Sequence, residues 1–119
     1  MNQKKNVLKE RSFQFSLNVI SFFKQLPNSA IYWKLSDQLL RSGTSIGANI
    51  HEAISSSSKK EFIRYYEISL KSANETVYWL ELFEQANLAD KDKITPLLNE
   101  AQELARMLAS SIKTMKRSL

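Results

Sequence analysis

The chain has 119 residues, a formal net charge of +5 and no cysteine. This length is typical of one domain, and the lack of cysteine excludes disulfide bonds and thiolate metal sites. Two glycines and two prolines are too few for an all-β protein with many tight turns. The net positive charge is consistent with a polyanionic partner. The alternative is that the charge serves only solubility.

The N-terminal segment contains basic residues, but no continuous apolar stretch and no small-residue cleavage site follow them. We therefore expect no signal peptide. No apolar run approaches the roughly 18 residues of a membrane span. The sequence predicts a cytoplasmic protein without a membrane partner.

The first predicted helix covers residues 6–26 and ends before Pro27. Its apolar positions alternate at spacings of four and three, with Ser12 in the gap, which is the period of a helix face packed on its neighbours. These positions are Leu8, Phe15, Val19, Phe22 and Leu26. A second apolar line widens this face and predicts more than one neighbour: Phe13, Leu17 and Ile20.

The second predicted helix covers residues 29–55, with Asn28 as its N-cap. Gly43 and Gly47 lie four residues apart on one of its apolar lines. Each interior glycine costs about 1 kcal/mol relative to alanine. The pair therefore predicts close approach of a neighbouring backbone, and a kink or hinge is the alternative.

The third predicted helix covers residues 59–86 and starts with a capping box, in which Ser58 and Glu61 satisfy the first turn. Its seam has heptad-like spacing from Ile63 to Leu80. The fourth helix covers residues 93–118, and either Asp90 or Asp92 caps it. Its C-terminal end is crowded by cations that complement the helix dipole: Lys113, Lys116 and Arg117.

Four long helices with short connections predict an all-α fold, an antiparallel up-down-up-down four-helix bundle formed by residues 1–119. Several aromatic side chains cannot all face one bundle core, so we expect a homo-oligomer. These side chains are Phe13, Phe62, Tyr65, Tyr78 and Trp79.

The segment SIGANIHEA at residues 45–53, followed by SSKKEF at residues 57–62, resembles a family of small bacterial four-helix bundle proteins. Early members of that family are encoded in intervening sequences of large-subunit ribosomal RNA genes. The resemblance covers nearly the whole chain and includes Arg106-Met107-Leu108 in the fourth helix. Ala53 departs from the family pattern, which has glycine after the glutamate, and this bears only on the end of the second helix.

The same fold occurs in accessory proteins of diversity-generating retroelements. Those proteins assemble as five-fold barrels and bind a reverse transcriptase and nucleic acid. The resemblance therefore implies a homopentamer. It also implies structured RNA, or a protein of the reverse transcriptase type, as a partner.

Basic residues supply the candidate nucleic-acid contacts, because clustered Lys and Arg side chains neutralise phosphates. They are Lys59, Lys60, Arg64, Lys71, Arg41, Arg106, Lys113 and Arg117. Lys4, Lys5, Lys9 and Arg11 add a basic beginning to the first helix. The alternative is a solvated face in which Glu67 and Lys71 form a helix pair. No zinc-finger, RNP or recognition-helix motif is present, so binding would depend on shape and charge.

Six residues are assigned to structure or assembly: Gly43, Gly47, Asn49, Glu52, Ser58 and Glu61. Asn49 lies on an apolar line and is expected to bond to a neighbouring helix or to the turn at Ser55–Ser58, with a ligand contact as the alternative. His51 is the only histidine, and no catalytic triad, Glu-x-x-His pair or phosphate-binding glycine loop is present. We expect no enzyme activity, no cofactor and no metal site.

The sequence thus favours a non-catalytic assembly and binding module. Oligomerisation would gather the basic faces for structured RNA or a nucleoprotein partner, so that avidity strengthens individually weak contacts. The alternative is a structural protein–protein adaptor without a nucleic-acid role. In that case, exposed aromatic residues such as Tyr78 or Trp79 would dominate partner binding.

Overall fold

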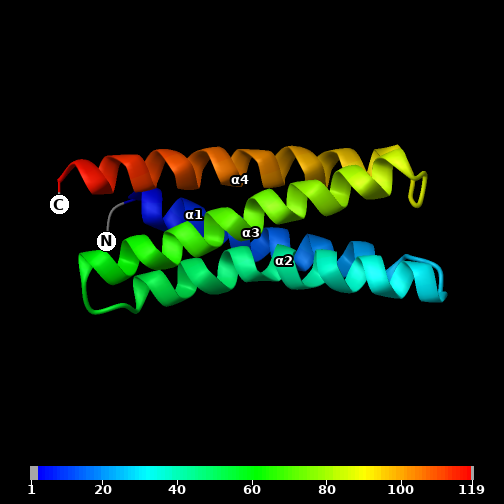
Figure 1. The fold of residues 1–119 in the computed structure, drawn as a ribbon, viewed down its shortest axis with the longest axis horizontal. Helices are drawn as coiled ribbons and strands as arrows, with labels where there is room; N and C mark the ends of the chain where they lie inside the picture. Colours follow the sequence, from blue (N-terminus) through cyan, green and yellow to red (C-terminus); the bar gives the residue numbers. More distant parts are fainter. Residues whose placement is uncertain (1–2, 119) are drawn as a thin grey trace.

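The computed structural model describes residues 3–118, with side chains from Val7 onward. It contains four α-helices, each longer than twenty residues (Figure 1). Their bounds are α1 Gln3–Lys24, α2 Ala30–Ile54, α3 Lys59–Gln85 and α4 Lys91–Arg117. No strand occurs in this part of the chain. The predicted all-α four-helix bundle is therefore confirmed.

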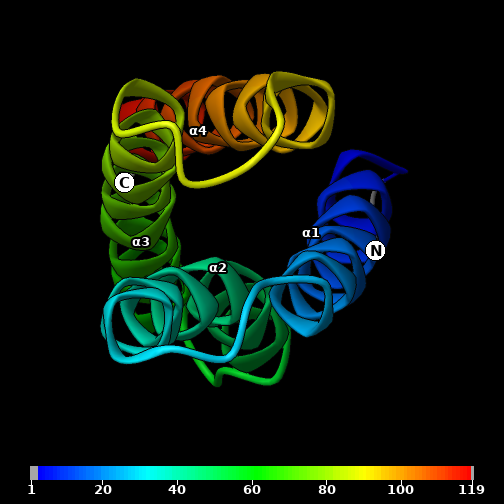
Figure 2. The same ribbon diagram turned by 90° about the vertical axis from the view of Figure 1, so that its right-hand side faces the viewer.

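The helices form an elongated bundle of 47 × 20 × 19 Å. Seen end-on, they follow one another around a square in chain order, and neighbours along the chain are antiparallel (Figure 2). The α2–α3 and α3–α4 pairs are the most extensively packed, and α1 and α4 pack least. The start of α1, the end of α4 and the α2–α3 turn consequently lie at the same end of the bundle (Figure 1).

Across the sparsely packed α1–α4 seam, Arg11 is held by a two-point contact. Its Nε and Nη2 atoms donate hydrogen bonds to the carboxylate of Glu100 at 2.9 and 2.5 Å. The hydrogen bond to Glu100 raises the pKa of Arg11 above its ordinary value. Bidentate geometry of this kind fixes orientation as well as charge, so it sets the position of α1 against α4.

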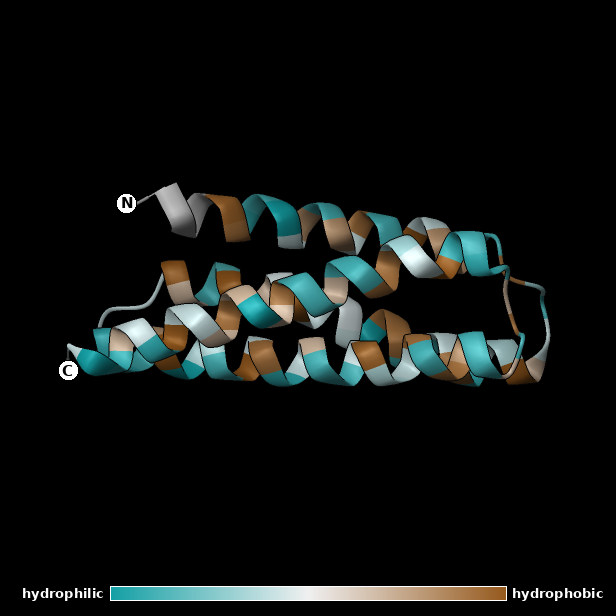
Figure 3. Ribbon diagram, turned by 90° about the horizontal axis from the view of Figure 1, so that it is seen from above, coloured by the Kyte–Doolittle hydropathy of each residue, from teal (hydrophilic) through white to brown (hydrophobic). Residues whose placement is uncertain are grey.

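The core is formed by the predicted apolar faces. Leu8, Phe15 and Val19 of α1 are at most 1% exposed, and Ser12 is buried between them. Apolar and polar segments alternate along the helices (Figure 3), as expected for helices with one packed face. No helix of the described residues is both long and apolar enough to cross a membrane.

Hydroxyl groups tie α2 to α3 along their contact. Ser69 Oγ donates to the carbonyl of Ile46 at 2.8 Å, and Thr76 Oγ1 lies 2.9 Å from Ser42 Oγ. Between these two links, the Ser72 and Ser45 hydroxyls are 3.0 Å apart. Because buried polar groups are costly unless bonded, these contacts favour one axial register between the two helices.

The helix ends agree only partly with the predicted caps. Ser58 Oγ accepts a hydrogen bond from the backbone N–H of Glu61 at 3.1 Å, as the capping box predicts. Asn28 was wrong as the α2 cap: Ser29 holds the N-cap position, since its carbonyl accepts the first helical hydrogen bond from the Trp33 N–H, and it makes no side-chain capping bond. Of the two aspartates proposed to cap the fourth helix, Asp90 holds the N-cap position, without a side-chain capping bond.

The five aromatic residues that cannot all face one bundle core divide into three classes. Phe62 is buried, with its ring 4.6 Å from that of Tyr66. Tyr65 and Trp79 are half-buried. Phe13 is 65% and Tyr78 is 56% exposed. Apolar surface on α1 and α3 is therefore left uncovered by this chain.

Tyr66 is 1% exposed, and its hydroxyl is the one buried side-chain polar atom without a hydrogen-bond partner in the described part of the chain. Burial raises its pKa from 10.0 to about 12. The folded state thus holds the phenol proton to higher pH than the unfolded state. The resulting stabilisation is complete below pH 10 and is lost as the pH rises toward 12.

We expect Tyr66→Phe to raise the free energy of unfolding by about 1 kcal/mol at neutral pH, because it removes an unsatisfied buried hydroxyl. The variant should also lose less stability than the wild type between pH 10 and 12. Urea unfolding at about pH 7 and about pH 11 measures both effects. Tyr78→Phe, at an exposed position, is the control. Identical pH profiles for the two variants would contradict this account of Tyr66.

Candidate nucleic-acid interface

The first half of α3 carries three of the predicted contact residues on its outer face. Lys60, Arg64 and Lys71 are all exposed there. The Arg64 guanidinium lies over the ring of Tyr65, 5.2 Å from its centroid. A cation–π contact of this kind orients the charge without neutralising it, so Arg64 remains available to an anionic partner.

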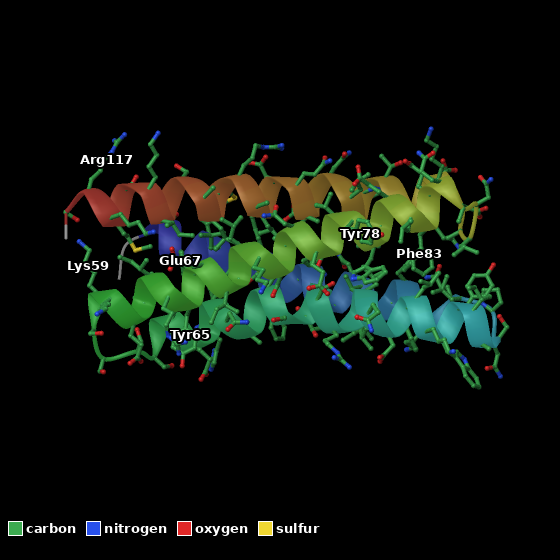
Figure 4. The ribbon with its side chains drawn as sticks, in the orientation of Figure 1. Lys59, Tyr65, Glu67, Tyr78, Phe83 and Arg117 are labelled. Carbon is green, nitrogen blue, oxygen red and sulfur yellow. The ribbon has the colours of Figure 1, made fainter. Side chains whose placement is uncertain are left out.

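The second half of α4 lies beside this face. Lys116 Nζ is 2.8 Å from the Glu67 carboxylate, and Lys59 Nζ contacts the backbone carbonyl of Ser118 at 3.3 Å. Figure 4 shows Lys59 and Arg117 at the same end of the bundle, on neighbouring helices. The Lys116–Glu67 ion pair replaces the Glu67–Lys71 helix pair that was the alternative, so Lys71 is left without an ion-pair partner among residues 7–118.

Charge is separated along the long axis. Residues 59–72 and 105–118 contain eight Lys and Arg residues but only two Glu residues. Residues 73–104, which lead to and from the opposite end, contain seven Asp and Glu residues and two Lys residues. A cluster of one sign raises the local concentration of opposite charge and speeds association. We call the following set the basic end: Lys59, Lys60, Arg64, Lys71, Lys113, Lys116 and Arg117.

Two predicted contact residues lie away from the basic end. Arg41 is on the middle of α2, close in register to Thr76, because its neighbour Ser42 bonds to Thr76. This places it about 24 Å along the axis from Lys60, at about 1.5 Å per residue. Arg41 faces Asp37 at 3.8 Å, and Arg106 is paired with Glu103 at 2.7 Å. The structure does not bring Arg41 and Arg106 together with the other six.

Sequence reasoning assigned Lys116 only to the helix dipole, although the structure places it in the basic end. Its position follows from the register of α3 against α4, which no single-helix pattern contains. The side chains of Lys4 and Lys5 lie outside the residues whose side chains are described. Lys9 is exposed on α1, and Arg11 is occupied by Glu100.

The residues assigned to structure lie mainly along α2. An ideal Cβ on Gly43 would be 3.1 Å from Val19 Cγ2, and one on Gly47 would be 3.2 Å from the backbone oxygen of Ser12. Both glycines therefore allow α1 to approach closely, and α2 continues through them without interruption. Glu52 is exposed, and Glu61 is half-buried behind the Ser58 cap.

Asn49 behaves differently from its prediction. Its Nδ2 donates to the carbonyl and hydroxyl oxygens of Ser45 at 2.9 and 3.0 Å, within α2 itself. The expected direct bond to a neighbouring helix or to the α2–α3 turn was wrong. The link to α3 is indirect, because Ser45 then contacts Ser72.

A groove that sequence reasoning missed lies between α1 and α2. It has a volume of about 730 Å³ and a mostly small or apolar floor. Its lining residues are Lys9, Glu10, Phe13, Ser16, Thr44, Gly47, Ala48, His51 and Glu52. His51 and Glu52 come from neighbouring positions on α2. No group of three His, Cys, Asp or Glu residues suited to a metal ion occurs within the described residues.

Known proteins place this geometry in a family. The chain is similar to the crystal structure of a protein of unknown function from the S23 ribosomal protein family of Bacteroides thetaiotaomicron VPI-5482, with a TM-score of 0.87 and 40% sequence identity. That similarity covers 93% of this chain and 99% of the other. No curated protein matches the sequence. The family model for the 23S rRNA-intervening sequence protein matches residues 4–110, and the chain therefore belongs to that family.

Proposed function

We propose that the protein is a non-catalytic assembly and binding module that contacts structured RNA, alone or within a nucleoprotein, through its basic end. The observation that carries the proposal is the gathering of basic residues from α3 and α4 at one end of the bundle, while acidic residues predominate toward the other. When Lys and Arg side chains at this density bind phosphates, they displace the counterions that were held there. The release of those counterions favours binding.

The binding would depend on charge and shape rather than on base readout. Lys60, Arg64 and Lys113 are exposed on rigid helices, and no loop reaches out from the described chain to follow a groove. Charged side chains placed along a helix can contact the phosphates of a folded RNA by its shape, without reading its bases. Assembly of several copies would multiply the basic ends on one particle, so that avidity adds to weak individual contacts.

The number of copies remains a prediction, with five as the number that the resemblance implies. A cytoplasmic location, where RNA is available, belongs to the same proposal. If the protein acts like the accessory proteins of retroelements, its nucleoprotein partner would contain a protein of the reverse transcriptase type.

The test is binding of the nuclease-treated protein to a fluorescent RNA hairpin, followed by anisotropy from low to physiological salt. We expect tight binding at low salt that weakens steeply as salt increases. The double variant Lys60→Glu/Arg64→Glu should bind at least about tenfold more weakly. Its logarithmic salt slope should also be smaller by about 2, because two side chains that neutralise phosphates have been replaced.

A matched control changes net charge by the same amount at the opposite end. Lys34 and Lys91 are exposed and form no ion pair among the described residues. Lys34→Glu/Lys91→Glu should therefore leave affinity within about twofold of wild type, because the screening length at physiological salt is about 8 Å. Equal decreases in affinity in the two double variants, or binding that does not respond to salt, would contradict the proposal.

The second candidate is a protein–protein adaptor, and exposed apolar side chains favour it. Ile31 and Trp33 at the start of α2 are 55% and 58% exposed, and Tyr78 on α3 is 56% exposed. Aromatic residues on an open surface are common anchors of protein interfaces. An adaptor would not bind RNA. Wild type would capture its protein partner equally well at low and high salt, and Trp33→Ser would not capture it.

A further inference from the structure

Two rows of cations run along the basic end, one on each helix. The α3 row consists of Lys60, Arg64 and Lys71, and the α4 row consists of Lys113 and Arg117. All five side chains are exposed, and none forms an ion pair with any of residues 7–118. Lys60 and Lys71 are eleven residues apart, which is about 16 Å at about 1.5 Å per residue. Each helix therefore offers its own line of charge to an anionic partner.

The register of the two helices sets these rows side by side. Lys116 on α4 pairs with Glu67 on α3 at 2.8 Å, which marks the seam between the helices. The helices are antiparallel, so positions that advance along α3 face positions that recede along α4. Counted from the ion pair, members of the two rows lie level to within two residues: Arg64 with Arg117, and Lys71 with Lys113.

The seam between the rows carries a neutralised pair rather than an open positive charge. The Glu67 carboxylate is held by Lys116, and Lys59 is turned onto the carbonyl of Ser118. A single strand of RNA that followed the seam would meet the Glu67 carboxylate, which repels phosphate. Two strands separated by a groove would instead place their phosphates over the two rows, with the groove over the ion pair.

The basic end has no exposed aromatic ring on which an unpaired base could stack. Residues 59–72 and 105–118 contain three aromatic residues. Phe62 and Tyr66 are buried, and the Arg64 guanidinium lies over the ring of Tyr65, which is half-buried. Proteins that hold single-stranded RNA commonly stack its bases on open aromatic side chains. The surface is therefore better suited to paired RNA, whose bases are already stacked on one another.

We propose that the basic end takes a double-helical RNA stem, with the α3 row on the phosphates of one strand and the α4 row on those of the other. The deep major groove of A-form RNA is narrow, and the axes of packed helices are about 8–10 Å apart. The major groove of B-form DNA is wider, at about 12 Å, so a DNA duplex fits the two rows less well. This inference rests on the proposed function and names the form of RNA that the basic end binds.

The experiment is competition against the labelled hairpin at low salt, with every competitor supplied at the same phosphate concentration. The competitors are an RNA duplex of about 16 base pairs, one of its strands with a sequence that does not fold, and a DNA duplex of the same sequence. We expect the RNA duplex to compete at least about tenfold better than the single strand and at least about threefold better than the DNA duplex.

A variant that lacks one row separates a two-strand contact from general attraction. Lys113→Gln/Arg117→Gln removes the α4 row and keeps the α3 row. If each row holds its own strand, affinity for the RNA duplex should fall at least about tenfold and affinity for the single strand less than about threefold. The preference for the duplex would then largely disappear. General attraction would instead lower both affinities by the same factor and would contradict the inference.

Exposed residues outside the basic end provide the controls. Lys34→Gln/Lys91→Gln removes the same charge elsewhere, and Tyr78→Ser removes an exposed ring about 10 Å beyond Lys71 along α3. Both should leave the affinities for all three competitors unchanged, and circular dichroism should show native helix content in every variant.

The outcomes separate this inference from the proposed function. A single strand or a DNA duplex that competes as well as the RNA duplex would overturn the inference and leave the proposed function in place. Weaker single-strand binding in Tyr78→Ser would do the same, because it would show that unpaired bases stack on this ring. Failure of the labelled hairpin itself to bind wild type would overturn both.

Discussion

Truncation of Phe22 to alanine is expected to lower the free energy of unfolding by about 3–4 kcal/mol. Phe22 is 5% exposed, and its ring packs edge-on against Phe83, with centroids 5.7 Å apart. The decrease combines the apolar surface that is no longer buried, a cavity that the long helices cannot close, and the aromatic pair itself. Urea unfolding followed by circular dichroism gives the value.

The loss of local stability in Phe22→Ala should be largest in α1. This helix packs least on α4, and Arg11–Glu100 is the one ion pair between the two helices among the described residues. With Phe22 truncated, the C-terminal half of α1 is no longer anchored to α3 by the aromatic pair. Amide hydrogen exchange should therefore accelerate more in α1 than in α2 and α3, because local opening draws on the least stabilised unit.

Ile63→Ala is the matched comparison, since Ile63 is also buried, at 4% exposure, but belongs to α3. It should destabilise the whole bundle by about 2–4 kcal/mol without a preference for α1. Exchange that increases evenly along the chain in Phe22→Ala would contradict the view that α1 is the separable element.

The helices themselves could be predicted because their signals are local. Spacings of three and four place Leu8, Phe15 and Val19 on one face whatever the neighbours are, and all three are buried. The Ser58 cap depends only on residues within one turn. Asn28 and Ser29 could not be separated in the same way, because the choice depends on how the Pro27 turn closes.

Burial of the second apolar lines could not be predicted, because it depends on which helix lies beside each face. Phe13 and Phe62 both widen an apolar face. Phe62 is covered in the folded chain, whereas Phe13 lies on the outer side of α1 and is 65% exposed. Asn49 shows the same limit, since its partner Ser45 lies on its own helix and the bond to α3 is made by Ser45.

The sequence predicts which interface residues share a face of one helix, but it does not predict which residues of different helices lie together. Lys60, Arg64 and Lys71 share a face of α3 by periodicity alone. The inclusion of Lys116 and the exclusion of Arg41 depend on axial register, which is set by pairs such as Lys116–Glu67 and Thr76–Ser42. The separation of charge between the two ends follows once the up-down topology is known, because α3 and α4 each carry their charges unevenly along their length.

Substitution of Gly47 by valine is expected to lower the free energy of unfolding by about 2–3 kcal/mol, the range of an overpacked contact. The first added carbon would lie 3.2 Å from the backbone oxygen and 3.3 Å from the carbonyl carbon of Ser12. Backbone atoms inside a helix cannot move individually, so α1 as a whole would have to shift outward. The small gain in helix propensity over glycine, at most about 0.5 kcal/mol, does not offset that displacement.

Gly43→Ala distinguishes this steric effect from propensity. The nearest atoms to a new Cβ at Gly43 belong to the side chains of Val19 and Phe15, which can adjust by a few tenths of an ångström. Its cost should be offset by the roughly 1 kcal/mol gained on replacing a helical glycine, which leaves stability near that of wild type. If Gly47→Val and Gly43→Ala had equal melting temperatures, the Ser12 backbone would not be the limiting contact. A selective decrease in the stability of Gly47→Val would show that this contact sets the spacing of α1 from α2, and with it the width of the groove between these two helices.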